Sequence, residues 1–368
     1  MTLLPAETPG TAQRDAGTTA LLRQAIAVPA AGTILVYCLL PVLFLVSLFI
    51  GRYDVVPEHV VLLLVAPVLN LLPAGIIHIE PVWTAAEANV IYQIRLPRVI
   101  AAVLVGAGLS MAGATYQGLF KNPLVSPDIL GVSSGAGFGA ALAILLSWNM
   151  AMIQVSAFGF GILAVAITYL LSRLYRTTPT LILVLSGIIV GAFFTALISL
   201  TKYVADPYEK LPAITFWLMG SLASVRYSDI VLVVPLFLLA TFALLLIRWR
   251  INLLAVGDDE ARALGIDTKR MAQVIILCST LITASAVCIA GIIGWVGLIV
   301  PHLGRMLVGP DYTRLLPACL LLGACYMLVI DDLARMLTNA EIPLGILTAI
   351  IGAPFFAYLL GKRSVGWI

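Results

Sequence analysis

Three arginines stand out in a chain that is 61% apolar and only 11% charged. Arg95 and Arg98 flank the dipeptide Leu96-Pro97, and Arg335 lies far along the chain near the end of another apolar run. A guanidinium group binds a carboxylate through two parallel hydrogen bonds, so it supplies geometry as well as charge. We therefore predict that these arginines form a surface that receives carboxylates from another protein. Snorkelling of single side chains to a membrane interface is the alternative.

A second feature is the polar stretch 253–267, LLAVGDDEARALGID, which lies between two apolar runs. Its three acidic residues, 258–260, favour the start of a helix, because the helix macrodipole stabilises negative charge there. Ala261 and Leu264 give that helix an apolar face, and Gly265 is placed to end it. The pattern predicts a short helix pair that docks into a groove of a partner protein. A solvated connecting loop is the alternative interpretation.

Lys121-Asn122-Pro123-Leu124 must end the apolar helix that begins near Arg98. Pro123 lacks an N–H and disfavours helical geometry at the residue before it. A plain helix-terminating turn explains this sequence as well as a turn with a functional role does, so both interpretations stay open at this point.

Gly291, Gly294 and Gly297 form a stripe of small residues in GIIGWVGLIVPHLGR, 291–305. Such a stripe allows membrane helices to approach one another closely. We predict that these three glycines serve helix packing and bind nothing.

The chain lacks the residues that catalysis or nucleotide binding would need. It has no GxxxxGK[ST] motif, so ATP and its Mg would have to be bound by another polypeptide. The three histidines are too scattered for a metal site, and the five cysteines lie in apolar stretches without a CxxC pair. We therefore predict no catalytic residue, no metal site and no cofactor in this chain. An intramembrane protease would need paired aspartates, Ser with His, or HExxH within its spans.

The elements that carry these residues are predicted to be membrane-spanning helices. Apolar windows of about 17–22 residues recur along the chain, which is the length needed to cross a hydrocarbon core of about 30 Å. The fold class is therefore an all-α polytopic membrane protein with about ten transmembrane helices. The predicted spans are roughly 31–50, 98–118, 131–147, 153–171, 180–200, 229–247, 271–291, 292–308, 314–330 and 343–361.

The positive-inside rule predicts the orientation. With ten spans and a cytoplasmic N-terminus, most of the 21 Lys and Arg residues face the cytoplasm, whereas Arg95, Arg98 and Arg335 lie on the outer face. Counting 60–77 as a span would reverse the orientation of every later helix, and the excess of Lys and Arg on the cytoplasmic side would be lost. We therefore interpret that segment as interfacial or re-entrant. Residues 1–27 are predicted to be a disordered cytoplasmic tail without a signal-peptide pattern. Residues 28–368 are predicted to be a single transmembrane domain with both termini in the cytoplasm.

Taken together, the motifs resemble those of the FecCD-like permeases of type II ABC importers, which carry ferric siderophores, haem and vitamin B12. The block 95–137, RLPRVIAAVLVGAGLSMAGATYQGLFKNPLVSPDILGVSSGAG, resembles the first signature of that family. The segment 253–267 is similar to its LxLGxxxAxxLG coupling loop, and 291–305 closely resembles its second signature. The resemblance runs from about residue 31 to residue 361.

The resemblance implies a role for each group of residues. In the family, arginines at the matching positions receive glutamates from the two lobes of a periplasmic or lipid-anchored substrate-binding protein. The coupling loop sits in a cleft of the ATPase subunit, and a cytoplasmic gate lies at the turns before the third and fifth spans. The implied residues are Arg95, Arg98 and Arg335 for docking, Leu254, Gly257, Glu260, Ala261, Leu264 and Gly265 for coupling, and Asn122, Pro123, Leu124 and Thr178 for the gate.

The resemblance also implies a vitamin-B12-permease-like fold and a homodimer in the bacterial inner membrane, served by two cytoplasmic ATPase subunits. Transport would occur by ATP-driven alternating access. The expected cargo is a metal chelate, with a ferric siderophore as the default and haem or cobalamin as other candidates. The alternative is an ion-coupled secondary transporter, but the predicted spans hold no carboxylate away from their ends. The net charge of +3 is small and gives no reason to expect a nucleic-acid partner.

Overall fold

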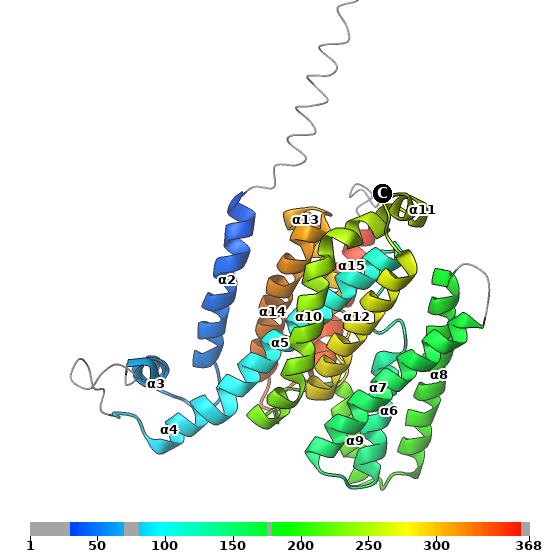
Figure 1. The fold of residues 1–368 in the computed structure, drawn as a ribbon. Coiled ribbons are helices and arrows are strands. Elements are labelled where there is room, and N and C mark those ends of the chain that lie inside the picture. The colour runs from blue at the N-terminus through cyan, green and yellow to red at the C-terminus, as the bar shows by residue number, and fades with distance from the viewer. Residues whose placement is uncertain (1–29, 70–80, 175–178, 362–368) are drawn as a thin grey trace, which may run out of the picture.

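The computed structural model describes residues 30–69, 81–174 and 179–361, and within them every regular element is helical (Figure 1). Some of the helices are short, and one is a π-helix, η1, between α4 and α5. The elements are α2 (Ala30–Phe49), α3 (Pro57–Leu69), α4 (Ala85–Asn89), η1 (Val90–Arg95), α5 (Leu96–Phe120), α6 (Val132–Leu145), α7 (Met150–Arg173), α8 (Pro179–Val204), α9 (Lys210–Met219), α10 (Tyr227–Val256), α11 (Asp258–Ala263), α12 (Thr268–Ala290), α13 (Val296–Val308), α14 (Tyr312–Met336) and α15 (Leu344–Gly361).

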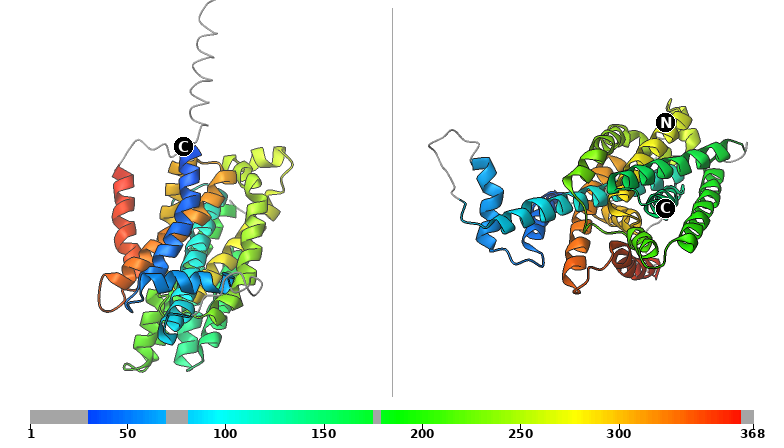
Figure 2. Two further views of the ribbon diagram at one scale, coloured as in Figure 1. Left: turned by 90° about the vertical axis from the view of Figure 1, so that its left-hand side faces the viewer. Right: turned by 90° about the horizontal axis from the view of Figure 1, so that it is seen from below.

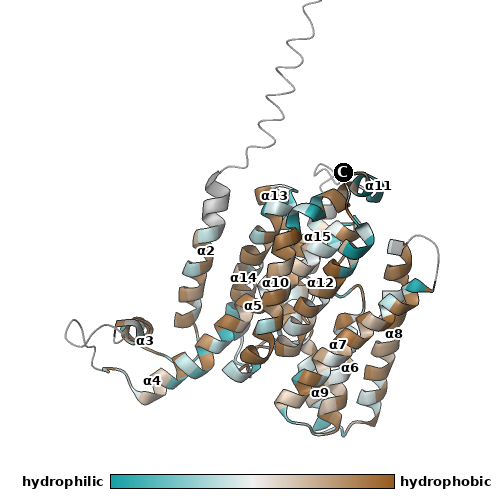
Figure 3. Cartoon of the chain, in the orientation of Figure 1, coloured by the Kyte–Doolittle hydropathy of each residue, from teal (hydrophilic) through white to brown (hydrophobic). Residues whose placement is uncertain are grey.

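Hydropathy and length identify the helices that can cross a membrane. Among the described residues six helical stretches are long and apolar enough, and five further apolar helices are 10–17 residues long. Figure 3 shows apolar residues along most of the bundle and hydrophilic residues gathered on α11. The predicted spans correspond to the six long stretches and to four of the shorter helices. The all-helical polytopic fold is therefore confirmed, whereas the count of ten spans stays a prediction.

Helix α3 covers the described part of the segment that we interpreted as interfacial. It lies across the direction of the long helices instead of running beside them (Figures 1 and 2). Val60 and Leu63 on this helix are fully buried, and the hydroxyl of Tyr92 donates a hydrogen bond to the carbonyl of Leu63. This crosswise placement fits an interfacial segment. Residues 70–77 and the tail 1–27 lie outside the described residues.

Helix α5 runs through the middle of the bundle and packs against α14, α12, α13 and α10. Small residues make this possible, because a Cβ on Gly106 would run into the backbone of Gly323 on α14, and a Cβ on Gly113 would run into the backbone of Gly297 on α13. The hydroxyl of Ser110 also donates to the carbonyl of Cys319 at 2.5 Å. Close backbone approach and interhelical hydrogen bonds are the main sources of helix association in lipid.

The crossing of α5 and α14 gives a first prediction. We expect Gly106→Ala to lower the melting temperature of the detergent-purified protein, because its methyl group has no space beside the Gly323 backbone, and overpacking costs about 1–3 kcal/mol. The matched control is Gly159→Ala on α7, since a Cβ there meets nothing within 4 Å. Equal melting temperatures for the two variants would contradict the close approach.

Candidate functional site

The three predicted docking arginines lie together at the end of the bundle opposite α11. Arg98 forms a bidentate ion pair with Asp331 on α14, with Nε–Oδ2 and Nη2–Oδ1 distances of 3.0 and 2.9 Å. Its Nη1 also donates to Glu341 at 2.9 Å. Arg335 pairs with Asp331 at 3.2 Å and with Asp332 on its own helix. Two of the arginines, Arg98 and Arg335, thus pair with three carboxylates between α5, α14 and the loop that follows α14.

The same arginines hold the C-terminal end of α2. Arg95 donates to the carbonyls of Leu48 at 2.7 Å and Phe49 at 3.1 Å, and Arg335 donates to the carbonyl of Ile50 at 2.8 Å. The last carbonyls of a helix have no partner within the helix, so these guanidinium groups supply the missing donors. Ser47 adds a hydrogen bond to Asp332 at 2.7 Å. The cluster thus ties α2 to the central helices.

The three arginine side chains are buried, whereas the residues of a simple docking surface would be exposed. Arg95, Arg98 and Arg335 are only 3%, 5% and 6% exposed, and each donates hydrogen bonds to groups within the chain. The docking role stays a prediction, and the geometry gives the arginines a structural role in addition. Our sequence reasoning missed their partners, although Asp331 and Asp332 precede Arg335 by four and three residues, the spacing of neighbours on one helix face.

The predicted coupling residues gather at the other end of the bundle. Leu254 and Ala261 are buried and fix α11 to the core, whereas Leu264 is 65% exposed. Gly265 has φ of +80°, a conformation that favours glycine, and the N–H of Ile266 donates to the carbonyl of Ala261 at 3.0 Å. This is the hydrogen bond of a glycine-terminated helix. The short helix therefore ends in a tight turn that presents an apolar side chain outward.

Two further coupling residues, Gly257 and Glu260, contact each other at the start of α11. The carboxylate of Glu260 folds back over Gly257 so closely that a Cβ at position 257 would overlap it. Glu260 is exposed and flexible and the φ of Gly257, 178°, is ordinary extended backbone, so this contact does not by itself require glycine at the break between α10 and α11. The polar side chain thus covers the junction of the two helices.

The predicted gate turn is linked to the coupling helix by an ion pair. Lys121, which ends α5 in the left-handed conformation with φ of 51°, places its Nζ 2.6 Å from Asp258 on α11. Asn122 stabilises the turn by accepting from the N–H of Leu124 at 2.9 Å. Leu124 is 51% exposed. Pro123 follows Asn122 in the same turn, and Thr178 lies outside the described residues.

A buried glutamine on α5 holds the gate turn in register with α13. The Nε2 of Gln117 donates to the carbonyls of Val125 and Gly297, both at 3.2 Å, and its Oε1 accepts from Arg305 at 2.6 Å. Movement of α13 would therefore be transmitted directly to the turn after α5. Our sequence reasoning did not single out this residue, because a lone Gln in an apolar run gives no indication of its partners.

The three glycines of the stripe differ in their surroundings. A Cβ on Gly297 would run into Pro127 and the backbone of Leu109, so only glycine fits between α5 and α13. Gly291 has φ of +71° and ends α12 against the backbone of Trp217 and Gly220. These contacts support a packing role for the two residues. A Cβ on Gly294 meets nothing within 4 Å, so the structure offers no packing role for it.

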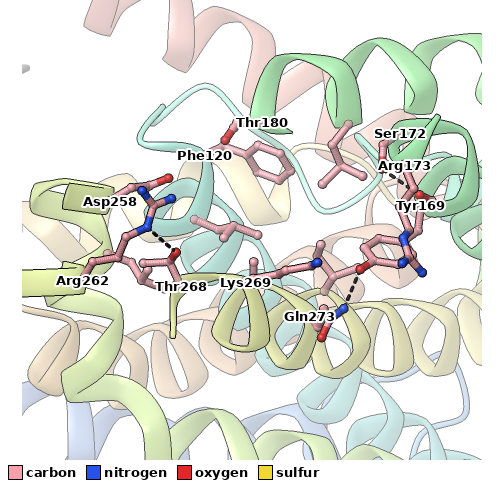
Figure 4. A pocket seen from close by; sticks show the side chains of 15 residues that line it. Phe120, Tyr169, Ser172, Arg173, Thr180, Asp258, Arg262, Thr268, Lys269 and Gln273 are labelled. Carbon is pink, nitrogen blue, oxygen red and sulfur yellow. Dashed lines mark hydrogen bonds between the residues drawn. The ribbon is translucent and has the colours of Figure 1, made fainter. Parts of the chain in front are cut away.

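Two cavities accompany these residues. A cavity of about 790 Å³ lies at the end that carries the arginine cluster and is lined by Trp148, Trp217, Lys210, Glu209 and Glu341 among others. A cavity of about 520 Å³ lies at the opposite end, beside α11 (Figure 4). Within the part of the chain that the structure describes, no group of His, Cys, Asp and Glu side chains could hold a metal ion.

Helices long and apolar enough to cross a membrane, a short polar helix at one end and ligand-sized cavities fit a membrane permease. A model of the FecCD transport family matches residues 39–362, and the chain belongs to this family. It is 43% identical to the molybdate import system permease protein MolB of Haemophilus influenzae over 328 residues, which cover 89% of this chain and 94% of MolB. It is 41% identical over 272 residues to a probable iron chelatin transport system permease protein of Helicobacter pylori, covering 74% and 82%.

A solved structure agrees with this assignment. It is described as an inward-facing conformation of a metal-chelate type ABC transporter, is 42% identical, and superposes with a TM-score of 0.77 over 89% of this chain and 97% of the other. The expected family is thus confirmed. The chain is a permease subunit of an ABC importer and not an enzyme, and a separate subunit hydrolyses ATP. The ion-coupled secondary transporter considered above is therefore set aside.

The arginine cluster gives a second prediction. We expect Arg98→Ala to destabilise the protein by about 3–5 kcal/mol, because it removes the bidentate partner of the buried Asp331 and leaves that carboxylate with Arg335 alone. Thermal unfolding in detergent measures this loss. The control is Arg270→Ala, whose ion pair with Asp267 is exposed and contributes at most about 1 kcal/mol. If Arg98→Ala were no less stable than the control, the structural role of the cluster would be wrong.

The link between the gate turn and α11 gives a third prediction. We expect Lys121→Glu and Asp258→Lys each to lower the ratio of substrate uptake to ATP hydrolysis in proteoliposomes, by up to about fivefold, since a partly exposed ion pair contributes about 0.2–1 kcal/mol. The double variant, which exchanges the two charges, should recover most of the wild-type ratio. A double variant as poor as the single variants would show that the two residues act independently.

Proposed function

We propose that this chain moves a metal chelate, most specifically a ferric siderophore, into the cytoplasm as the permease of a binding-protein-dependent importer. The observation that carries this proposal is the 790 Å³ cavity near the arginine cluster. Its volume lies within the range of small-molecule sites, about 300–1,000 Å³. Tryptophan rings beside Lys210 and Glu209 provide both apolar surface and polar partners, which suits an organic ligand wrapped around a metal ion.

We further propose that the end with α11 faces the cytoplasm, with both termini on that side, and that two copies of the chain form a homodimer with the transport pathway between them. Two ATPase subunits would dock on α11 and the exposed Leu264. Closure of the ATPases would then pull on α11, and the Lys121–Asp258 ion pair would carry the movement to the gate turn at Asn122, Pro123 and Leu124. Two helix packings of similar energy are enough for such a change, because each ligand shifts the balance between them.

In this proposal the substrate-binding protein docks at the end of the bundle opposite α11. Glu341 is the most exposed carboxylate of the arginine cluster, with 28% of its side chain accessible. A carboxylate from the binding protein could replace Glu341 on Arg98 without disturbing the buried pair with Asp331. In this form the predicted docking role of Arg95, Arg98 and Arg335 is compatible with their burial. Such an exchange would depend on salt concentration, as charge pairs at the rim of an interface do.

Molybdate is a second candidate substrate. The specific observation in its favour is the relative MolB, which is matched over nearly its whole length. Molybdate is a small oxyanion and would fill only a fraction of a 790 Å³ cavity. A metal chelate would fill more of the same space, and we therefore rank the chelate before molybdate as the candidate substrate.

Uptake into proteoliposomes distinguishes the two candidates and gives a fourth prediction. The chain is reconstituted with its ATPase and binding protein, and accumulation of radioactive ferric siderophore is compared with that of radioactive molybdate. We expect ATP-dependent uptake of the chelate, and we expect Ala213→Trp, which narrows the cavity, to reduce it severalfold. Uptake of molybdate alone, insensitive to Ala213→Trp, would replace the first candidate with the second.

A further inference from the structure

The function proposed above uses only Asp258 among the polar residues of the 520 Å³ cavity beside α11, and assigns no ligand to that cavity. It lies between α5, α7, α8, α11 and α12, and its lining includes Arg173, Arg262 and Lys269 against a single carboxylate, Asp258 (Figure 4). Asp258 is already paired with Lys121, and Arg262 with Asp259 at 3.2 Å. Among the described residues neither Arg173 nor Lys269 makes an ion pair. The cavity therefore presents two cations that are not neutralised.

An apolar groove continues from this cavity along the seam between α7 and α12. The groove has a volume of about 310 Å³ and shares Tyr169, Gln273 and Ile276 with the cavity. Gln273 donates to the hydroxyl of Tyr169 at 2.6 Å and so marks the junction of the two spaces (Figure 4). Beyond the junction the lining is mostly aliphatic, from Ile162, Val165, Ala166 and Leu277. These residues belong to stretches long and apolar enough to span the membrane.

A ligand that fits both spaces needs an anionic head and a hydrocarbon tail. We propose that an anionic phospholipid of the bilayer binds here, with its phosphate between Arg173 and Lys269 and an acyl chain in the α7–α12 groove. Basic pockets between membrane helices bind anionic headgroups in this way, and the positive-inside rule assigns this end to the cytoplasmic leaflet. A soluble phosphate would use the cations and leave the apolar groove empty. The lipid also fills the space beneath α11, because Asp258 and Arg262 line the same cavity.

The test uses the full-length chain, purified and delipidated in detergent. Binding of phosphatidylglycerol is measured by native mass spectrometry and compared with phosphatidylcholine of the same acyl chains and with soluble glycerol phosphate. We expect phosphatidylglycerol to bind most tightly. Replacing Arg173 and Lys269 together by alanine should weaken its binding about 30-fold, since each cation near the membrane surface contributes about 1 kcal/mol, or about fivefold in affinity.

Two further variants distinguish lipid binding at this site from a general effect of the protein's charge. Arg270→Ala with Arg314→Ala removes the same charge from exposed positions outside the cavity lining and should leave phosphatidylglycerol binding unchanged. Ala166→Trp fills the groove without changing any charge and should weaken binding severalfold. The proposal would be overturned by equal affinity for the two lipids, by an equal loss in the Arg270–Arg314 control, or by glycerol phosphate competing as well as the lipid.

Discussion

The structure depends on how closely helices approach α5. In lipid, burying apolar surface against another helix gains little, so association relies on backbone contact and hydrogen bonds. Gly106 and Gly113 let α14 and α13 lie against α5, and Gln117 then bonds both to α13 and to the turn that follows α5. The central helix is thus fixed to its neighbours at several heights.

Charge is handled differently at the two ends of the bundle. At one end Arg98, Asp331 and Arg335 are buried and neutralise one another, an arrangement that is costly to break because each ion would be left desolvated. At the other end Lys121 and Asp258 are partly exposed, and such pairs exchange at little cost. The first end is therefore suited to hold α2 in place. The second is suited to transmit movement between α11 and the gate turn.

The sequence predicted the helices, including the short polar helix α11, because they follow from local rules. A span needs about 20 apolar residues, and α11 begins at its acidic residues and ends near Gly265 as the macrodipole and left-handed glycine require. It did not predict the partners of the arginines, since Asp331 lies 233 residues from Arg98. Nor did it identify Gln117, or the contact of Gly106 with Gly323, because packing of distant helices has no local pattern. The role of Gly294 was expected from spacing alone, and the structure gives no contact that explains it.

The central claim is that this permease is driven through α11 by a separate ATPase. The most direct measurement is purification of the chain from native membranes in mild detergent, followed by mass spectrometry of its stoichiometric partners. We predict one P-loop ATPase subunit for each permease chain, and loss of that subunit when Gly265 and Glu260 are replaced. A chain that purifies alone and still accumulates substrate in sealed vesicles would contradict the account.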